Sequence, residues 1–120
     1  MLLPAAPDVV ALLVAQGELT VAGIDAFSEW SRAGDQDAAA ALRAAQHKAY
    51  HARRDLLAAL QAALSTPVDQ EDVFILSERI DRILTEARDT LREAEVLGRA
   101  PDAYTAHMAQ RLWFAVLRGA

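Results

Sequence analysis

His47 and His51 are the side chains best suited to metal chemistry, because they stand four residues apart and one helical turn would bring their imidazoles together. Glu78 and Asp81, three residues apart, would complete such a site from a second helix. On a helical wheel, however, both histidines and Glu78 point away from the apolar stripes, which favours a solvated surface. His107 stands alone and is predicted to lie on the surface. Metal binding is therefore an alternative interpretation, and no cofactor is expected.

A basic cluster of Lys48, Arg53 and Arg54 has the charge to meet a phosphate group or an acidic partner. The chain as a whole has 12 Lys and Arg against 17 Asp and Glu, a formal net charge of −5. This acidic balance favours a solvated charged face over an anion site. It also makes nucleic acid a poor candidate partner, because its phosphates bind clustered cations.

Catalytic signatures are missing from the sequence. The chain has no cysteine, which excludes disulfides and thiolate metal sites. It contains no G-x-S-x-G elbow, no P-loop and no dinucleotide-binding glycine pattern. An enzyme is the least favoured class, and we expect a non-catalytic protein.

Amino-acid composition and the positions of glycine and proline predict the helices that carry these residues. The chain has 120 residues, which suits a single domain over 1–120, and 53% of them are apolar. Few glycines and prolines and much alanine and leucine favour packed helices. We predict an all-α, up-down antiparallel bundle of about four helices over 8–31, 35–65, 69–97 and 101–118. The two long central helices would form a hairpin through residues 65–68.

Apolar residues at three- and four-residue steps predict the buried stripe of each helix. Two residues in the first stripe have more than one interpretation. Gln16 either hydrogen-bonds across the bundle and fixes its register or lies half exposed at a groove, and Gly23 either allows a close helix approach or is a tolerated weak spot. The stripe of the third helix is Val73, Leu76, Ile80, Ile83, Ala87, Leu91 and Ala94.

The first residues, Met1-Leu2-Leu3-Pro4, have no basic region and no long apolar segment, so no signal peptide is expected. The apolar run over 9–15 is too short to span a bilayer. We therefore expect a cytoplasmic protein without direct membrane insertion, whose membrane role, if any, comes through a partner.

Residues 66–73 predict a turn and a helix start. Pro67 ends the preceding helix because it disfavours α geometry at Thr66. Asp69 then caps the next helix, and Asp72 lies in its first turn, where negative charge is stabilising.

This segment reads Thr66-Pro67-Val68-Asp69-Gln70-Glu71-Asp72-Val73. It resembles the T-P-x-D-R-E-D-I segment of the PhoU-like family, in the branch that accompanies Pit-type phosphate permeases. Residues 76–84 are similar to that family's L-x-x-x-L-D-D-I-L stretch, and the opening Leu2-Leu3-Pro4 is similar to its start. The resemblance implies a regulatory or accessory protein of phosphate transport that docks onto a permease or another signalling protein.

The family also places acidic pairs on the two facing helices, where they hold metal. The matching positions here are Gln46, Tyr50, Asp81 and Thr85, so Asp81 alone keeps an acid. Because Arg82 follows it, Asp81 is expected to form an ion pair.

Family members usually continue into further helices that this chain lacks. Trp113 projects almost opposite to Tyr104 on a helical wheel, and Phe114 lies to one side. Apolar groups on several sides of a terminal helix predict a homo-oligomer interface at Trp113 and Phe114. A structural homo-oligomer, like a metal- or anion-binding bundle, is the alternative to the docking function.

Overall fold

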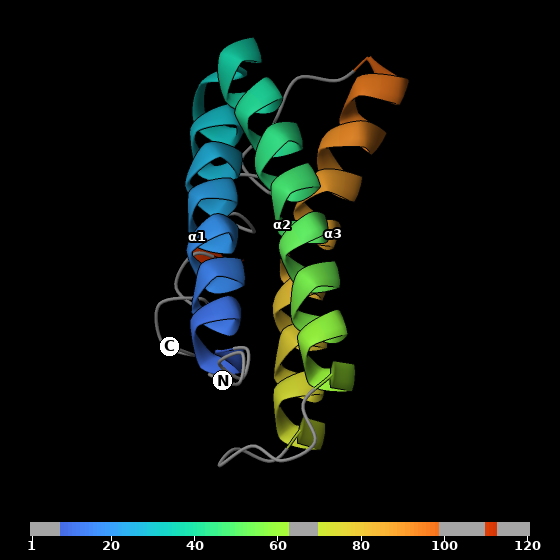
Figure 1. The fold of residues 1–120 in the computed structure, drawn as a ribbon. Coiled ribbons are helices and arrows are strands. Elements are labelled where there is room, and N and C mark those ends of the chain that lie inside the picture. The colour runs from blue at the N-terminus through green and yellow to red at the C-terminus, as the bar shows by residue number, and fades with distance from the viewer. Residues whose placement is uncertain (1–7, 63–69, 99–109, 113–120) are drawn as a thin grey trace, which may run out of the picture.

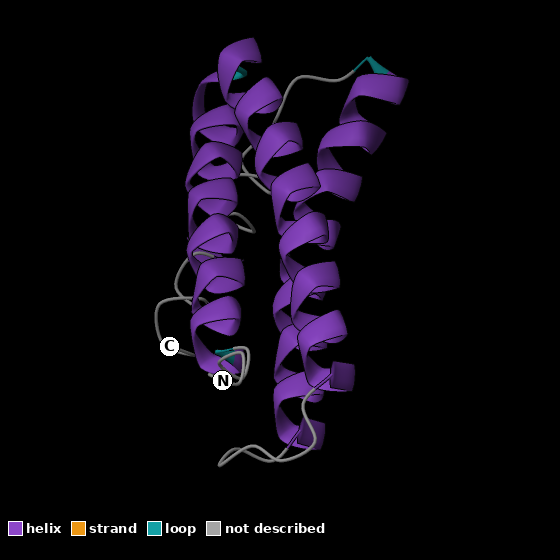
Figure 2. Cartoon of the chain, in the orientation of Figure 1, coloured by secondary structure: helices purple, strands orange, loops and turns teal. Residues whose placement is uncertain are grey.

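Three long helices make up most of the structure, a computed structural model that describes residues 8–62, 70–98 and 110–112. The helices are α1 (Val9–Ala33), α2 (Gln36–Ala62) and α3 (Gln70–Leu97). They run alternately up, down and up (Figure 1), and no strand occurs in the described residues (Figure 2). The prediction of an all-α chain is confirmed. The turn between α2 and α3 and most of the predicted fourth helix lie outside the described residues.

Local sequence sets the boundary between α1 and α2. The carboxylate of Asp8 accepts a hydrogen bond of 2.9 Å from the backbone N–H of Ala11 and thereby caps the start of α1. Gly34 ends α1 with a φ of 65°, and its N–H donates to the carbonyl of Trp30. A residue with a side chain would be strained in this left-handed geometry, so glycine ends the helix here.

Close packing of α1 against its neighbours depends on Gly23. The α1 helix packs most extensively against α2, and α3 contacts both. A Cβ atom at position 23 would overlap Cδ1 of Leu84 on α3 and lie 3.3 Å from Cβ of Ala45 on α2. The interpretation of Gly23 as a point of close helix approach is therefore confirmed.

The buried apolar residues form two clusters along the bundle. The larger, which we call the upper core after its place in Figure 1, lies around the end of α1. It consists of Ile24, Phe27, Trp30, Ala38, Ala39, Leu42, Ala49, Leu84, Ala87 and Leu91. The smaller, which we call the lower core, lies where α1 and α3 begin and α2 ends. It consists of Val9, Leu56, Ala59, Leu60 and Val73.

A polar bridge between α1 and α3 lies between the two cores in both helices. Gln16 and Ser77 are both fully buried. The Gln16 amide Nε2 donates to the Ser77 carbonyl at 2.9 Å, and the Ser77 hydroxyl donates to Gln16 Oε1 at 2.6 Å. Each polar group is thus satisfied by the other, as burial requires. Gln16 hydrogen-bonds across the bundle, which is the first of its two predicted roles.

The burial of Ser77 shows that the predicted buried stripe of the third helix is wrong at one position. Leu76 was predicted to face inward but is 45% exposed, and Ser77 takes the buried position beside it. A one-residue step rotates the side chain by about 100° around the helix, so both cannot face inward. The reason is that a buried Gln16 needs a polar partner on α3.

The helix α1 is, by length and composition, apolar enough to cross a membrane. The core helix of a soluble protein and a signal sequence pass the same test, and 28% of the apolar window in α1 is buried. Gln16, Phe27 and Trp30 are among the buried residues of α1. The absence of direct membrane insertion stays a prediction.

Candidate functional site

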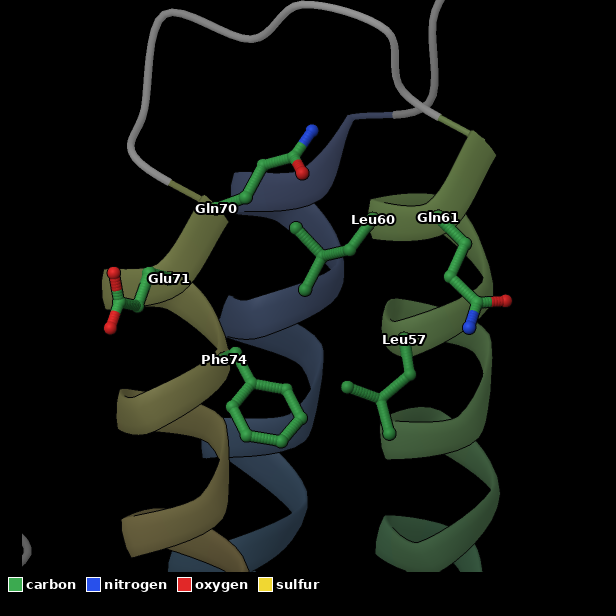
Figure 3. A pocket seen from close by; sticks show the side chains of 6 residues that line it. All are labelled: Leu57, Leu60, Gln61, Gln70, Glu71 and Phe74. Atoms are coloured by element: carbon green, nitrogen blue, oxygen red, sulfur yellow. The ribbon is translucent and has the colours of Figure 1, made fainter.

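An open pocket of about 320 Å³ lies between α2 and α3, beside the lower core. We call it the α2–α3 groove. Figure 3 shows Phe74 of α3 and Leu57 of α2 pointing toward one another across it. Its lining residues are Leu57, Leu60, Gln61, Gln70, Glu71 and Phe74. The floor is thus apolar, and the rim carries amide and carboxylate groups.

Phe74 contributes an exposed apolar ring to this groove. It is 44% exposed, although a phenyl ring is a large apolar group that folding normally buries. The guanidinium of Arg53 on α2 lies 5.9 Å from the centre of the ring. A cation over a ring face is weakly attractive at an exposed site, and here it leaves the ring accessible to solvent.

Arg53 also connects the groove to Asp81, the acid predicted to form an ion pair. Its Nη1 lies 4.0 Å from Oδ2 of Asp81 on α3, and both side chains are partly buried. The ion pair expected of Asp81 is therefore present, but with Arg53 from the facing helix. Arg82 instead lies 3.8 Å from Glu78, one turn earlier on α3. Two of the four predicted metal ligands thus lie beside arginines.

Three consecutive apolar residues, Phe74, Ile75 and Leu76, are exposed at the start of α3, at 44%, 38% and 45%. Because successive residues are rotated by about 100°, they face three directions around the helix. A folded protein rarely leaves such a run exposed unless it serves a function. The beginning of α3 is therefore apolar on several sides, with one side opening into the α2–α3 groove.

His47 and His51 converge on the exposed surface of α2. Their Nε2 atoms are 3.3 Å apart, and their rings meet edge to face at an interplanar angle of 83°. Tyr50 packs edge-on against His51 and is itself 49% exposed. The structure brings the two predicted histidines together, and the surface position read from the helical wheel is confirmed.

The structure does not bring the four predicted metal ligands, His47, His51, Glu78 and Asp81, together at one site. Within residues 8–62, 70–98 and 110–112, no three His, Asp or Glu side chains are grouped so as to hold an ion. Asp72 lies in the first turn of α3, where its charge meets the positive end of the helix dipole. Thr66, Pro67, Asp69, His107, Trp113 and Phe114 lie outside the described residues, so the predicted turn, cap and oligomer interface stay predictions.

Sequence reasoning missed the groove itself. Phe74, Leu57 and Leu60 were not singled out, because a search for chemistry favours charged and metal-binding side chains. One signal was available. Residues 73–76 are four consecutive apolar residues, Val-Phe-Ile-Leu, and an amphipathic helix with a single buried face cannot cover all four.

Comparisons with known proteins leave the family open. No protein-family model, no curated protein and no solved structure matches this chain. The resemblance to PhoU-like proteins therefore rests on the sequence motif of residues 66–73 and its surroundings.

Proposed function

We propose that this chain is a non-catalytic docking protein that uses the α2–α3 groove and the exposed start of α3 to bind a phosphate permease. The observation that supports the proposal is the exposed run of Phe74, Ile75 and Leu76 beside an apolar pocket. Exposed apolar patches with polar rims mark protein interaction sites. The resemblance in residues 66–73 supplies the link to phosphate transport, and we include a PhoU-like four-helix arrangement in the proposal.

The chemistry of the groove fits an apolar helix or peptide. Leu57, Leu60 and Phe74 offer a surface for one or two apolar side chains, as in recognition of an amphipathic helix by a groove. Gln61 stands at the rim, where its amide group can hydrogen-bond to a partner's polar edge. Binding in this mode requires no chemical step.

Charge favours a partner at the cytoplasmic face of a membrane. The chain carries a net charge of −5, and Glu71 stands on the rim of the groove. The cytoplasmic loops of membrane proteins are enriched in lysine and arginine. Opposite charges steer the two surfaces together and set their orientation. A permease with apolar and basic groups on its cytoplasmic loops is complementary to this surface.

A photo-crosslinking experiment in cells tests the proposal. A photoreactive phenylalanine analogue at position 74 is expected to crosslink to a phosphate permease, identified by mass spectrometry. The matched control places the same analogue at position 96 near the other end of α3, where Val96 is 77% exposed and remote from the groove. Crosslinks only to unrelated proteins, or equal crosslinking from both positions, would reject the proposal.

A variant measurement follows from the same surface. Phe74→Ser should weaken binding to the permease about tenfold or more, because truncated aromatic anchors commonly cost over 1 kcal/mol. Val96→Ser should leave binding unchanged. Circular dichroism of both variants verifies that the helices remain folded. Unaltered binding by a folded Phe74→Ser variant would show that the groove does not contact the permease.

A further inference from the structure

The two imidazole Nε2 atoms of His47 and His51 lie at a separation that suits a chelate. Both residues lie on α2 and are exposed, one turn apart, and their Nε2 atoms are separated by 3.3 Å. A metal with Zn–N distances of about 2.0–2.1 Å and tetrahedral angles holds two nitrogens about 3.3–3.4 Å apart. The two imidazoles are therefore placed at the separation that one ion would impose.

We propose that His47 and His51 form a binding site for a borderline divalent cation of the Zn²⁺ or Cu²⁺ class. Imidazole nitrogen suits these metals, whereas Mg²⁺ and Ca²⁺ prefer oxygen ligands. This inference is independent of the docking proposal, because it concerns a different set of residues on α2 and requires no protein partner.

The rest of the coordination shell comes from solvent. Among the described residues no third His, Asp or Glu joins the pair in a metal-holding group. Glu78 and Asp81 lie beside Arg82 and Arg53 instead. Since both histidines are exposed, water molecules can complete the shell, which gives an open and exchangeable site. Such a site differs from a closed structural zinc centre, whose four ligands all come from the protein.

The helix holds the two ligands in place before metal arrives. Ala49, between the histidines in sequence, is 3% exposed and fixes this turn of α2 against the bundle. Tyr50 packs against the ring of His51 with centroids 5.5 Å apart. Without metal, the 3.3 Å contact is compatible with one Nε2–H donating to the other nitrogen. When metal binds, that imidazole must carry its proton on Nδ1 instead, so that both Nε2 lone pairs face the ion. Because an imidazole binds metal only in its neutral form, the affinity should weaken on acidification.

Calorimetric titration with ZnCl₂ and with CuCl₂ tests the site, using the full chain free of any polyhistidine tag. We expect one ion per chain, with Cu²⁺ bound more tightly than Zn²⁺. Binding should weaken by about tenfold or more between about pH 7.5 and about pH 5, as protons compete for the nitrogens. Absence of binding of either metal near pH 7.5 would overturn the proposal.

Metal affinities of histidine variants test whether His47 and His51 are the ligands. His47→Gln and His51→Gln should each reduce the affinity about tenfold or more, and His107→Gln should not change it. A double variant, His51→Gln with Arg54→His, keeps the number of histidines but places two of them seven residues apart, about 10 Å along the helix. It should bind no better than His51→Gln alone. Full affinity in that double variant, or in both single variants of the pair, would refute the chelate.

Stoichiometry provides a further criterion. The proposal requires one metal ion per chain at a site built by a single α2 helix. Light scattering with metal analysis on the same peak should give this ratio without a change in mass on adding ZnCl₂. One ion per two chains, with a doubling of the mass, would contradict the single-chain site.

Discussion

The upper and lower cores are enclosed by the same three helices but differ in what fills them. In the upper core Phe27 and Trp30 are fully or almost fully buried and stack with their ring centres 5.9 Å apart. In the lower core the only nearby aromatic among the described residues, Phe74, remains 44% exposed at the groove. The two ends of the same three helices therefore differ in how far they bury their aromatic side chains. The upper core encloses all its large apolar groups and so stabilises the fold. Beside the lower core, the ring of Phe74 stays exposed at the groove that we propose as a docking surface.

The largest expected effect on stability is the loss on replacing Phe27, compared with the loss on replacing Phe74. Phe27→Ala should lower the free energy of unfolding by about 3–5 kcal/mol, because it removes a fully buried ring and leaves a cavity. Phe74→Ala should lower it by less than about 1.5 kcal/mol, since the ring is half exposed and loses chiefly its contact with Arg53. Urea denaturation monitored by circular dichroism measures both. Equal losses would mean that the lower core contributes as much to folding as the upper.

The polar bridge between the two cores should show strong coupling. Gln16→Leu should destabilise the fold by about 1–3 kcal/mol, because the buried Ser77 hydroxyl loses its acceptor. The double variant Gln16→Leu with Ser77→Ala should recover much of that loss, since no unpaired polar group remains. A double-mutant cycle in urea gives the interaction energy. Additive losses would show that the two side chains do not depend on each other.

Two glycines of α1 provide a matched test of close packing. Gly23→Ala should destabilise by about 1 kcal/mol, because crowding against Leu84 and Ala45 outweighs the gain in helix propensity. Gly17→Ala should stabilise by up to about 1 kcal/mol, since no atom lies within 4 Å of the added methyl group. Thermal unfolding of the two variants reports the sign of each change. A stabilising Gly23→Ala would indicate that Leu84 moves aside freely.

The smallest expected effect comes from the ion pair between α2 and the end of α3. Arg43 Nη1 lies 3.0 Å from both carboxylate oxygens of Glu95, but both side chains are more than 40% exposed. Arg43→Ala should therefore change stability by about 1 kcal/mol or less, because solvent and salt screen an exposed pair. Denaturation at low and high salt measures it. A loss above about 2 kcal/mol would show that the upper ends of α2 and α3 depend on this contact.

Apolar periodicity predicted most of the buried positions, for a physical reason that also explains its failures. Val73, Ala87 and Leu91 on α3 were assigned inward and are buried, because side chains three and four residues apart share a face. Ser77 was missed and Leu76 misplaced, because an apolar scan cannot detect a polar residue that is buried by virtue of its partner.

The candidate sites were predictable to different degrees. The spacing of His47 and His51 predicted their proximity, since it follows from helix geometry alone. The nitrogen separation depends on side-chain rotamers, which spacing does not determine. Arg53 as the partner of Asp81, and the groove at Phe74, depend on how α2 and α3 approach each other. Such contacts between distant segments are not encoded in any local pattern.

Native-state hydrogen exchange, followed amide by amide, tests the division between the two cores most directly. We predict the greatest protection around Phe27, Leu42 and Leu84, with opening free energies near that of global unfolding. Amides around Leu60 and Val73 in the lower core should exchange through smaller openings of lower free energy. Equal protection in both cores, or greater protection in the lower core, would contradict the account that the upper core stabilises the fold while the lower end remains available to a partner.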